Sequence, residues 1–253
     1  MPANNIDIAL IPARQGSVRI PLKNIKLLNG IPLVAYTIQS ALKSNVFSEV
    51  VVSTDSTEIA KIARDWGARV PDLRPTEFSG SSSPDLDWVM HAIEHFVEAK
   101  KDEIDCVAIL RPTNPLRTPL TIKRAIRLFK ENLWADSLRA MEITHIHPGK
   151  MWRVNDAMEA VPYVDQSQEV TPTHNRPTQS LEEVWVQNAS LEVTRLTSLI
   201  QSNSISGKRV MGFQMPGYEG FDLNGPLDWK LLEFLAREQP ELIPKLDLPN
   251  QGS

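Results

Sequence analysis

The order of apolar and amphipathic segments predicts an α/β protein built on a doubly wound, mostly parallel sheet. Three short apolar runs occur at residues 6–11, 49–53 and 105–110. A polar loop and then a segment of helical periodicity follow each run, so that β-loop-α units repeat along the chain. Such units place parallel strands side by side, with helices on both faces of the sheet. A chain of 253 residues is long enough for one domain of this kind.

Each predicted strand ends abruptly in a polar loop. "IDIALI" stops at Pro12, "EVVVS" at "TDST" and "DCVAIL" at the proline-rich "RPTNPLRTP". Short continuous apolar runs are typical of strands that are buried on both faces. Ligands of doubly wound sheets bind at the carboxyl ends of the strands. We therefore expect the loops after Ile11, Ser53 and Leu110 to face one crevice.

Helical spacing marks the segments between the strands. Pro32 suits a first helical turn, Asp55 or Ser56 can cap the second helix, and Gly67 can end it. Asp85 can cap the third helix. The four predicted helices cover residues 32–44, 54–67, 86–100 and 120–132.

The regular pattern ends in the second half of the chain. A polar, proline-containing stretch favours an inserted β-arm, at about residues 143–182, over a separate domain. Residues 183–195 then predict a strand, a turn and a second strand, and residues 208–215 predict a further strand. A last helix is expected to start near Pro226. These segments make one domain over residues 1–240, with the arm inserted and a tail at 241–253.

Composition excludes several classes of protein. A net charge of -4 argues against a general nucleic-acid binder. No apolar run approaches the roughly 20 residues that a membrane helix needs, so no membrane partner is expected. The N-terminal "MPANNID" has no signal-peptide pattern. Cys106 is the only cysteine and cannot form a disulfide within the chain, which favours the cytoplasm.

The loop after the first strand concentrates positive charge. Arg14, Arg19 and Lys23, with the backbone N–H groups of residues 15–17, would form a basic nest for a polyphosphate. The loop is neither a Walker A motif nor a Rossmann fingerprint, because it lacks GxxxxGK[ST] and has only one glycine. The alternative interpretation is a surface loop with incidental basic residues.

Seven motifs occur in order over roughly residues 6–235. They are "IPARQGSVRIPLKNI", "VVSTDSTEIAKIARDWGA", "RPTEF", "LRPTNPLRT", "HPGK", "NRPTQ" and "FDLNGPLDW". This ordered set resembles the acylneuraminate cytidylyltransferase family, the CMP-sialic acid synthetases, whose nucleotide-binding signature "IPARGGSKRIPRKNI" is similar to the first motif. It implies a fold of the nucleotide-diphospho-sugar transferase type, with an arm used for dimerisation.

The resemblance also implies a reaction. The anomeric hydroxyl of an acidic sugar would attack the α-phosphorus of CTP, diphosphate would leave, and Mg²⁺ would help to offset charge. CTP and the acidic sugar would be the small-molecule substrates of a homodimer. Arg14, Lys23 and Asp222 match catalytic positions, and Asp222 and Asn224 match the family's "DID" metal motif. The residues expected at the nucleotide are Ala13, Arg14, Gly16, Ser17, Asn24, Arg74 and Asp85.

The acidic sugar is expected at Arg111, Lys150, Arg176, Asn188 and Glu192. Lys150 and Arg176 lie on the arm, which in the family reaches a neighbouring subunit's site; the alternative is a solvated arm with ordinary surface charge. Arg111 replaces a glutamine of the family and could clamp a carboxylate, phosphonate or phosphate. The alternative for Arg111 is a structural ion pair with a nearby acid.

Other departures from the family widen the choice of function. Val18 replaces a lysine, Glu192 a tyrosine, and Asn224 the second metal-binding aspartate. We expect a nonulosonic or octulosonic acid as acceptor, with a phosphonate or phosphate acceptor as the alternative. A guanylyltransferase on the same fold and a nucleotide-binding protein without catalysis also stay open, since Asp85 could read cytosine or guanine. The sequence shows no covalent nucleophile, which favours direct in-line transfer.

Overall fold

The chain divides into two compact units. The computed structural model describes residues 6–80, 83–97, 103–164 and 171–248. One unit, which we call the body, runs to Ala140 and resumes at Asn188; the other, the arm, is Met141–Gln187. The expected arm, residues 143–182, falls within this second unit. Among the described residues, no helix is long and apolar enough to cross a membrane.

The body is built on a six-stranded sheet with the strand order β10-β6-β9-β5-β1-β4. β1 pairs in parallel with both β4 and β5, while β9 runs antiparallel to β5. This arrangement confirms the predicted doubly wound, mostly parallel α/β fold. The strands of the sheet are β1 (Ile6–Pro12), β4 (Glu49–Ser53), β5 (Ile104–Leu110), β6 (Ser137–Ile143), β9 (Trp185–Arg195) and β10 (Val210–Gln214).

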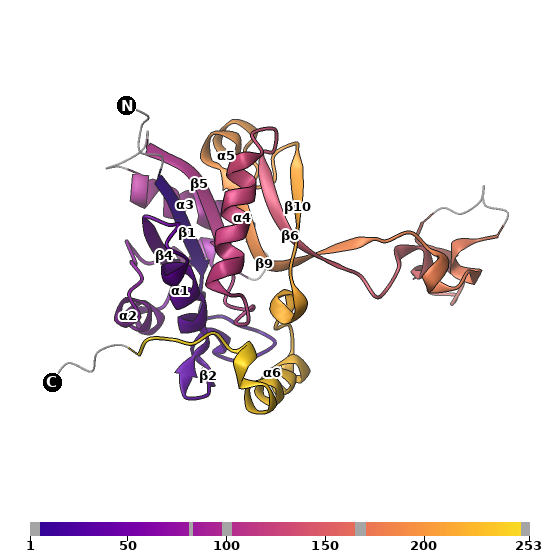
Figure 1. Cartoon of the computed structure of the whole chain (residues 1–253), viewed down its shortest axis with the longest axis horizontal. Coiled ribbons are helices and arrows are strands. Elements are labelled where there is room, and N and C mark those ends of the chain that lie inside the picture. The colour runs from indigo at the N-terminus through magenta and orange to yellow at the C-terminus, as the bar shows by residue number, and fades with distance from the viewer. Residues whose placement is uncertain (1–5, 81–82, 98–102, 165–170, 249–253) are drawn as a thin grey trace. The chain divides into compact units, whose positions relative to one another are not determined.

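Helices cover both faces of the sheet because side chains alternate along each strand. Ala9 and Ile11 of β1 face a core shared with α1, α2 and α4, and α1 and α4 lie side by side over that face (Figure 1). Ile8 and Leu10 face the opposite core, with α3 and α5. The helices are α1 (Leu33–Ser44), α2 (Thr57–Asp65), α3 (Asp85–Val97), α4 (Pro119–Glu131), α5 (Leu196–Ser202) and α6 (Pro226–Glu238).

A third apolar cluster supports the loops of the site. It joins the β2–β3 hairpin, the start of α1 and the buried side of α6, through residues such as Leu28, Leu223 and Trp229. The hairpin strands are β2 (Leu27–Leu28) and β3 (Ile31–Pro32). Short 3-10 turns complete the body at Lys23–Ile25, Thr76–Phe78, Gly217–Gly220 and Pro240–Leu242.

Some local features differ from the predictions. Residues 183–195 do not turn: β9 is one continuous strand, and its last five residues pair with β5 from Cys106 to Leu110. The segment "NAS", which favours a turn locally, lies within this strand. Of the two candidate caps of α2, Ser56 accepts the hydrogen bond from Ile59 N–H. Helix α3 begins at Asp85 itself, and the end predicted for it at residues 98–100 lies outside the described residues.

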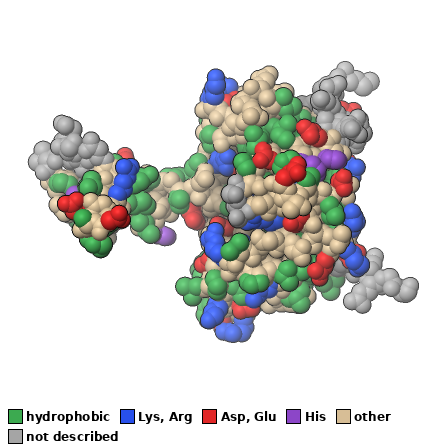
Figure 2. Space-filling model, turned by 180° about the vertical axis from the view of Figure 1, so that it is seen from behind, with side chains coloured by type: hydrophobic (Ala, Val, Ile, Leu, Met, Phe, Trp, Pro, Cys, Tyr) green, Lys and Arg blue, Asp and Glu red, His purple; other side chains and the backbone are tan. Residues whose placement is uncertain are grey.

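The arm contains a small antiparallel hairpin, β7 (Trp152–Val154) with β8 (Ala160–Pro162). Its 3-10 turns are Pro148–Lys150, Thr173–Asn175 and Thr178–Ser180. Figure 2 shows hydrophobic side chains among charged ones on the visible face of the arm. The large apolar side chains that the arm exposes are Ile143, Ile146, Met151, Trp152, Val154, Met158, Val161, Tyr163, Val164, Trp185 and Val186.

Candidate active site

A cleft of about 280 Å³ lies at the carboxyl ends of β1 and β5. The loops after Ile11 and Leu110 line this cleft, as the sequence predicts, whereas the loop after Ser53 contacts the opening loop through Asp55 and does not line the cleft. Seven of the expected site residues line the cleft, namely Arg14, Ser17, Lys23, Asn24, Arg74, Asp85 and Arg111. Val18, Arg19, Trp88 and Thr113 line it as well. Cationic side chains thus dominate its charge.

The opening loop is held by backbone and amide contacts. Asn24 is buried, and its Nδ2 donates a 2.8 Å hydrogen bond to the carbonyl of Arg14. Asp55 accepts a 2.8 Å hydrogen bond from the N–H of Gln15. Ala13 N–H donates to the carbonyl of Ser53, so β4 holds the start of the loop. Asn24 and Asp55 therefore position the loop, a task that their sequence positions do not reveal.

Arg14 holds the opposite wall of the cleft. Its Nη1 donates to the carbonyl oxygens of Ser79, at 3.2 Å, and Gly80, at 2.5 Å. Both acceptors are neutral, so the guanidinium keeps its full positive charge toward the cleft. Gly16 lies exposed in the same loop, and a Cβ placed on it would meet no atom within 4 Å. The loop therefore leaves open space in front of its backbone.

Lys23 links the opening loop to the loop before α6. Its Nζ donates a 3.1 Å hydrogen bond to the carbonyl of Leu223, and Leu223 N–H donates to the carbonyl of Thr113. Burial lowers the pKa of Lys23, while the nearby Asp222 carboxylate opposes this effect. The tertiary structure thus places Asp222 beside a cation of the cleft that lies about 200 residues away along the chain.

Asp222 has the chemistry that a hard cation requires. Its Oδ1 is buried and has no hydrogen-bond partner among the described residues, while Oδ2 accepts a 2.8 Å bond from Asn224 Nδ2. Carboxylate oxygens are the ligands that Mg²⁺ prefers, so the orphaned oxygen fits the expected metal. Asn224 is differently placed, because its Oδ1 faces Arg19 Nη1 at 3.5 Å. Asn224 supports Asp222 in this arrangement.

Arg74 is buried at the end of β4. Its Nε donates to Ser53 Oγ, its Nη2 donates to the Ser53 carbonyl, and its guanidinium stacks on the Trp88 ring at 4.9 Å. Burial lowers the pKa of Arg74 to about 10, and Asp55 and Asp85 partly offset the shift. The side chain therefore stays charged at neutral pH and adds to the positive potential of the cleft.

Arg111 pairs with two acids. Its Nη2 lies 2.6 Å from Asp85 Oδ2 and 3.1 Å from Glu192 Oε1. These contacts are structural ion pairs with nearby acids, which was the alternative to a substrate-binding role for Arg111. Glu192 also pairs with Arg139 of β6, a residue that no motif singled out because the strand at 137–143 was not predicted. Burial alone would raise the pKa of Asp85, yet the bonds and charge of Arg111 hold it below its ordinary value.

The remaining residues that the sequence predicts at the acceptor are divided between the two units. Asn188 belongs to the body, where its Oδ1 accepts from Ser190 N–H and its buried Nδ2 has no partner among the described residues. Lys150 and Arg176 belong to the arm. They border two 3-10 turns that pack tightly, since a Cβ on Gly149 would approach Thr173 Cγ2 to 2.4 Å. The arm thus brings the segments of Lys150 and Arg176 together.

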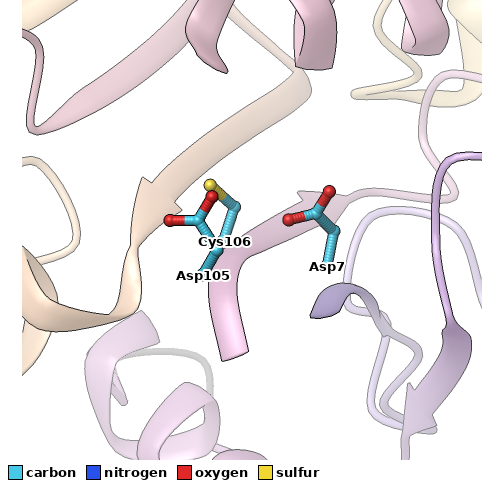
Figure 3. A group of neighbouring side chains, drawn as sticks. All are labelled: Asp7, Asp105 and Cys106. Carbon is cyan, nitrogen blue, oxygen red and sulfur yellow. The ribbon is translucent and has the colours of Figure 1, made fainter. Parts of the chain in front are cut away.

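A cluster of three potential metal ligands lies at the amino ends of β1 and β5, opposite the ends that face the cleft. Figure 3 shows Asp7 at the start of β1, with Asp105 and Cys106 at the start of β5. Lys130 pairs with Asp7 at 2.5 Å and with Asp105 at 3.7 Å, and Arg195 pairs with Asp105 at 3.6 Å. Two cations therefore already neutralise the two carboxylates. We interpret the cluster as a structural ion-pair network, far along the strands from the cleft.

The fold and the cleft define a class of protein, an α/β domain whose cationic crevice suits a polyphosphate. Residues 8–205 match the cytidylyltransferase family. The chain belongs to this family. The match and the named relatives support a CTP-dependent cytidylyltransferase.

Three curated proteins are similar to this chain over half of its length or more. The chain is 31% identical over 238 residues to CMP-N,N'-diacetyllegionaminic acid synthase of Legionella pneumophila, which covers 93% of this chain and 98% of that protein. It is 30% identical over 242 residues to N-acylneuraminate cytidylyltransferase A of Danio rerio, covering 93% of this chain and 53% of that protein. It is 38% identical over 126 residues to pseudaminic acid cytidylyltransferase of Campylobacter jejuni, covering 50% of this chain and 54% of that protein.

Solved structures share the fold. The structure of CMP:2-keto-3-deoxy-manno-octonic acid synthetase complexed with CTP superimposes with a TM-score of 0.64 at 15% identity, over 93% of this chain and 100% of that one. The 4-diphosphocytidyl-2C-methyl-D-erythritol synthase of Anaerococcus prevotii gives a TM-score of 0.61 at 9% identity, over the same shares. At these identities the likeness concerns the fold alone.

Proposed function

We propose that this protein transfers CMP from CTP to a nonulosonic acid and releases diphosphate. The observation that carries the proposal is the junction of Lys23 with the loop of Asp222 at the edge of the cleft. It joins a cation suited to a triphosphate to a carboxylate suited to a divalent cation. The names of the relatives support a nine-carbon acidic sugar as the acceptor class.

The proposed reaction is a direct displacement. A bond forms between the acceptor's hydroxyl oxygen and the α-phosphorus of CTP, the bond to diphosphate breaks, and the hydroxyl proton passes to solvent. Arg14 and Lys23 bind the triphosphate and offset the charge that develops on the leaving diphosphate. Asp222 would hold Mg²⁺, which supplies Lewis-acid stabilisation of phosphoryl oxygens when bound. Ala13, Gly16, Ser17 and Asn24 shape the loop at the nucleotide.

The arm completes the proposal. Its exposed apolar side chains support its use in a homodimer, in which Lys150 and Arg176 would serve the acceptor site. Lys150 and Arg176 lie outside the body, so the cleft of the body does not by itself show which ligand they would contact. A molar mass of twice 28.4 kDa in solution is expected, and a monomer would contradict this part. The cytoplasmic location expected from the single cysteine belongs to the same proposal.

The decisive experiment is a diphosphate-release assay. Each of the four nucleoside triphosphates is incubated with Mg²⁺ and one acid from a panel of nonulosonic acids, an octulosonic acid and phosphonates. We expect release with CTP and a nonulosonic acid, and a loss of about 100-fold or more in Arg14→Ala. Arg237→Ala is the matched control, because Arg237 pairs with the adjacent Glu238 and lies over the Phe234 ring on the exposed side of α6.

Other outcomes of the same assay separate the alternatives. Release with GTP would identify a guanylyltransferase, and release with a phosphonate would change the acceptor class. Binding of CTP, measured by thermal shift, without release for any acid of the panel would leave two interpretations, an acceptor outside the panel or a nucleotide-binding protein without catalysis. Full activity in Arg14→Ala would contradict the role of the opening loop.

A further inference from the structure

The cleft contains a four-residue ion network that runs from its wall into the sheet. Arg111 contacts Asp85 at 2.6 Å and Glu192 at 3.1 Å. Behind Arg111, Arg139 Nη1 pairs with the second oxygen of Glu192, and Arg139 Nη2 donates a 2.7 Å hydrogen bond to Ser206 Oγ. Arg111 and Asp85 line the cleft, whereas Glu192 and Arg139 do not.

Exposure differs sharply across the network. The side chain of Glu192 is 8% exposed and that of Arg139 is 15% exposed, but that of Asp85 is 45% exposed. A buried, doubly paired carboxylate is costly to separate from its partners, whereas a partly solvated ion pair contributes little. The contact between Arg111 and Asp85 is therefore the exchangeable one.

The charges of the network require an anion at this place. Arg111, Arg139 and Glu192 together carry one net positive charge, and Asp85 neutralises it. Without Asp85, Arg111 and Arg139 would share Glu192 as their counter-ion, and one positive charge of a largely buried pair of guanidinium groups would stay unbalanced, which is unfavourable. Any ligand that takes the place of Asp85 must therefore bring its own negative charge.

We propose that Asp85 is an internal anion in the acceptor subsite, and that the acidic group of the acceptor displaces it from Arg111. This inference rests on the proposed function and assigns the acceptor's anion to the body of the chain. Glu192 and Arg139 hold the guanidinium in place during the exchange. A neutral sugar carries no anion that could replace Asp85 beside Arg111, so the exchange selects acidic acceptors. Asp85 is then a competitor of the acceptor and not a reader of the nucleotide base.

The test measures binding at equilibrium. The full chain is titrated calorimetrically with N,N'-diacetyllegionaminic acid and with its neutral methyl ester. Asp85→Asn is the informative variant, since an amide oxygen can still accept the hydrogen bond that Trp88 Nε1 now donates to Asp85 Oδ1. Asp87→Asn is the matched control, because it removes a charge from the same first turn of α3 but not from the network.

We expect Asp85→Asn to bind the acid about threefold to fivefold more tightly than the natural protein does, the scale of a lost competing ion pair that is partly solvated. The ester should bind both proteins equally, and Asp87→Asn should leave both ligands unaffected. Arg111→Gln should remove the preference for the acid over the ester. Affinity for CTP should not change in Asp85→Asn, and thermal unfolding confirms that each variant is folded.

Three results would overturn the inference. One is an affinity for the acid that does not rise in Asp85→Asn, including no detectable binding. The second is a weaker affinity for CTP in that variant, which would assign Asp85 to the nucleotide. The third is an Arg111→Gln protein that still prefers the acid. The proposed function is tested separately by diphosphate release in the natural protein, so either proposal can fail while the other stands.

Discussion

The ammonium group of Lys23 lies 3.1 Å from the backbone carbonyl of Leu223 and donates a hydrogen bond to it. The contact joins the loop after β1 to the loop before α6, and it sets Asp222 beside the cleft. The cation expected at the triphosphate and the carboxylate expected at the metal are thereby held by the same short stretch of backbone.

Lys23→Met should impair catalysis severely. We expect kcat/KM for CTP to fall about 100-fold or more, because a positive charge that offsets the leaving diphosphate is lost. Initial rates of diphosphate release measure the change. Lys26→Met is the control, since Lys26 lies three residues further on and stacks over the Trp229 ring at 4.5 Å. A small effect in Lys23→Met would remove Lys23 from the machinery.

The pH dependence of CTP binding should report on the same lysine. Burial lowers the pKa of Lys23 below its ordinary value of 10.5. The charged form binds the triphosphate, so affinity should fall as pH rises through the lowered pKa. The stability of the unliganded protein should instead rise between the two pKa values, because the unfolded chain binds more protons there than the folded one. Titration of CTP into Lys23→Arg should remove the decline in affinity.

Asn224→Asp should lower the Mg²⁺ concentration that the reaction needs. A second carboxylate beside Asp222 offers a hard cation another charged ligand, whereas Asn224 now donates its amide to Asp222 Oδ2. We expect a decrease of about tenfold in the half-saturating Mg²⁺ concentration. Gln201→Glu adds the same charge on α5 and should leave this concentration unchanged. An unaltered requirement in Asn224→Asp would show that position 224 does not contact the metal.

Arg117→Met should destabilise the body. Arg117 is 1% exposed, and its guanidinium donates to the carbonyl and hydroxyl of Ser190 and to Thr37 Oγ1. Burial lowers the pKa of Arg117 to about 9, so the side chain is still protonated at neutral pH. Loss of these donors should lower the free energy of unfolding by about 3 kcal/mol in urea titrations. Arg127→Met, on the exposed face of α4, should change it by less than about 0.5 kcal/mol.

The single thiol should be inert in the folded protein. Cys106 is 0% exposed at the start of β5, and burial raises the pKa of its thiol. A thiol-specific chromogenic reagent should therefore label no cysteine in native buffer, and one per chain in urea, as the sequence contains one. Rapid labelling of the native protein would show that the structure opens around the amino end of β5, where Cys106 lies.

Local sequence patterns predict the main helices and strands of the body. The runs at β1, β4 and β5 are continuous and apolar because both of their faces are buried, and this signal can be followed residue by residue. The β-loop-α order then indicates which loops lie at the carboxyl ends of the strands, which is why Arg14, Lys23 and Arg111 are expected near one another, whereas Arg74 is expected there from the family resemblance. The continuity of β9 could not be predicted, because "NAS" favours a turn locally although it lies within the strand Trp185–Arg195.

The amino-acid sequence is sufficient to predict the fold class, the crevice and the chemical types of the residues that surround it. The partner of each charge, in contrast, depends on how the chain packs. Arg111 was open to a substrate or to a structural acid, and the answer depended on Asp85 and Glu192, which are 26 and 81 positions away in the chain. Ion pairs form between side chains that packing brings within a few ångströms, and sequence spacing does not encode such distances once the separation exceeds a helical turn.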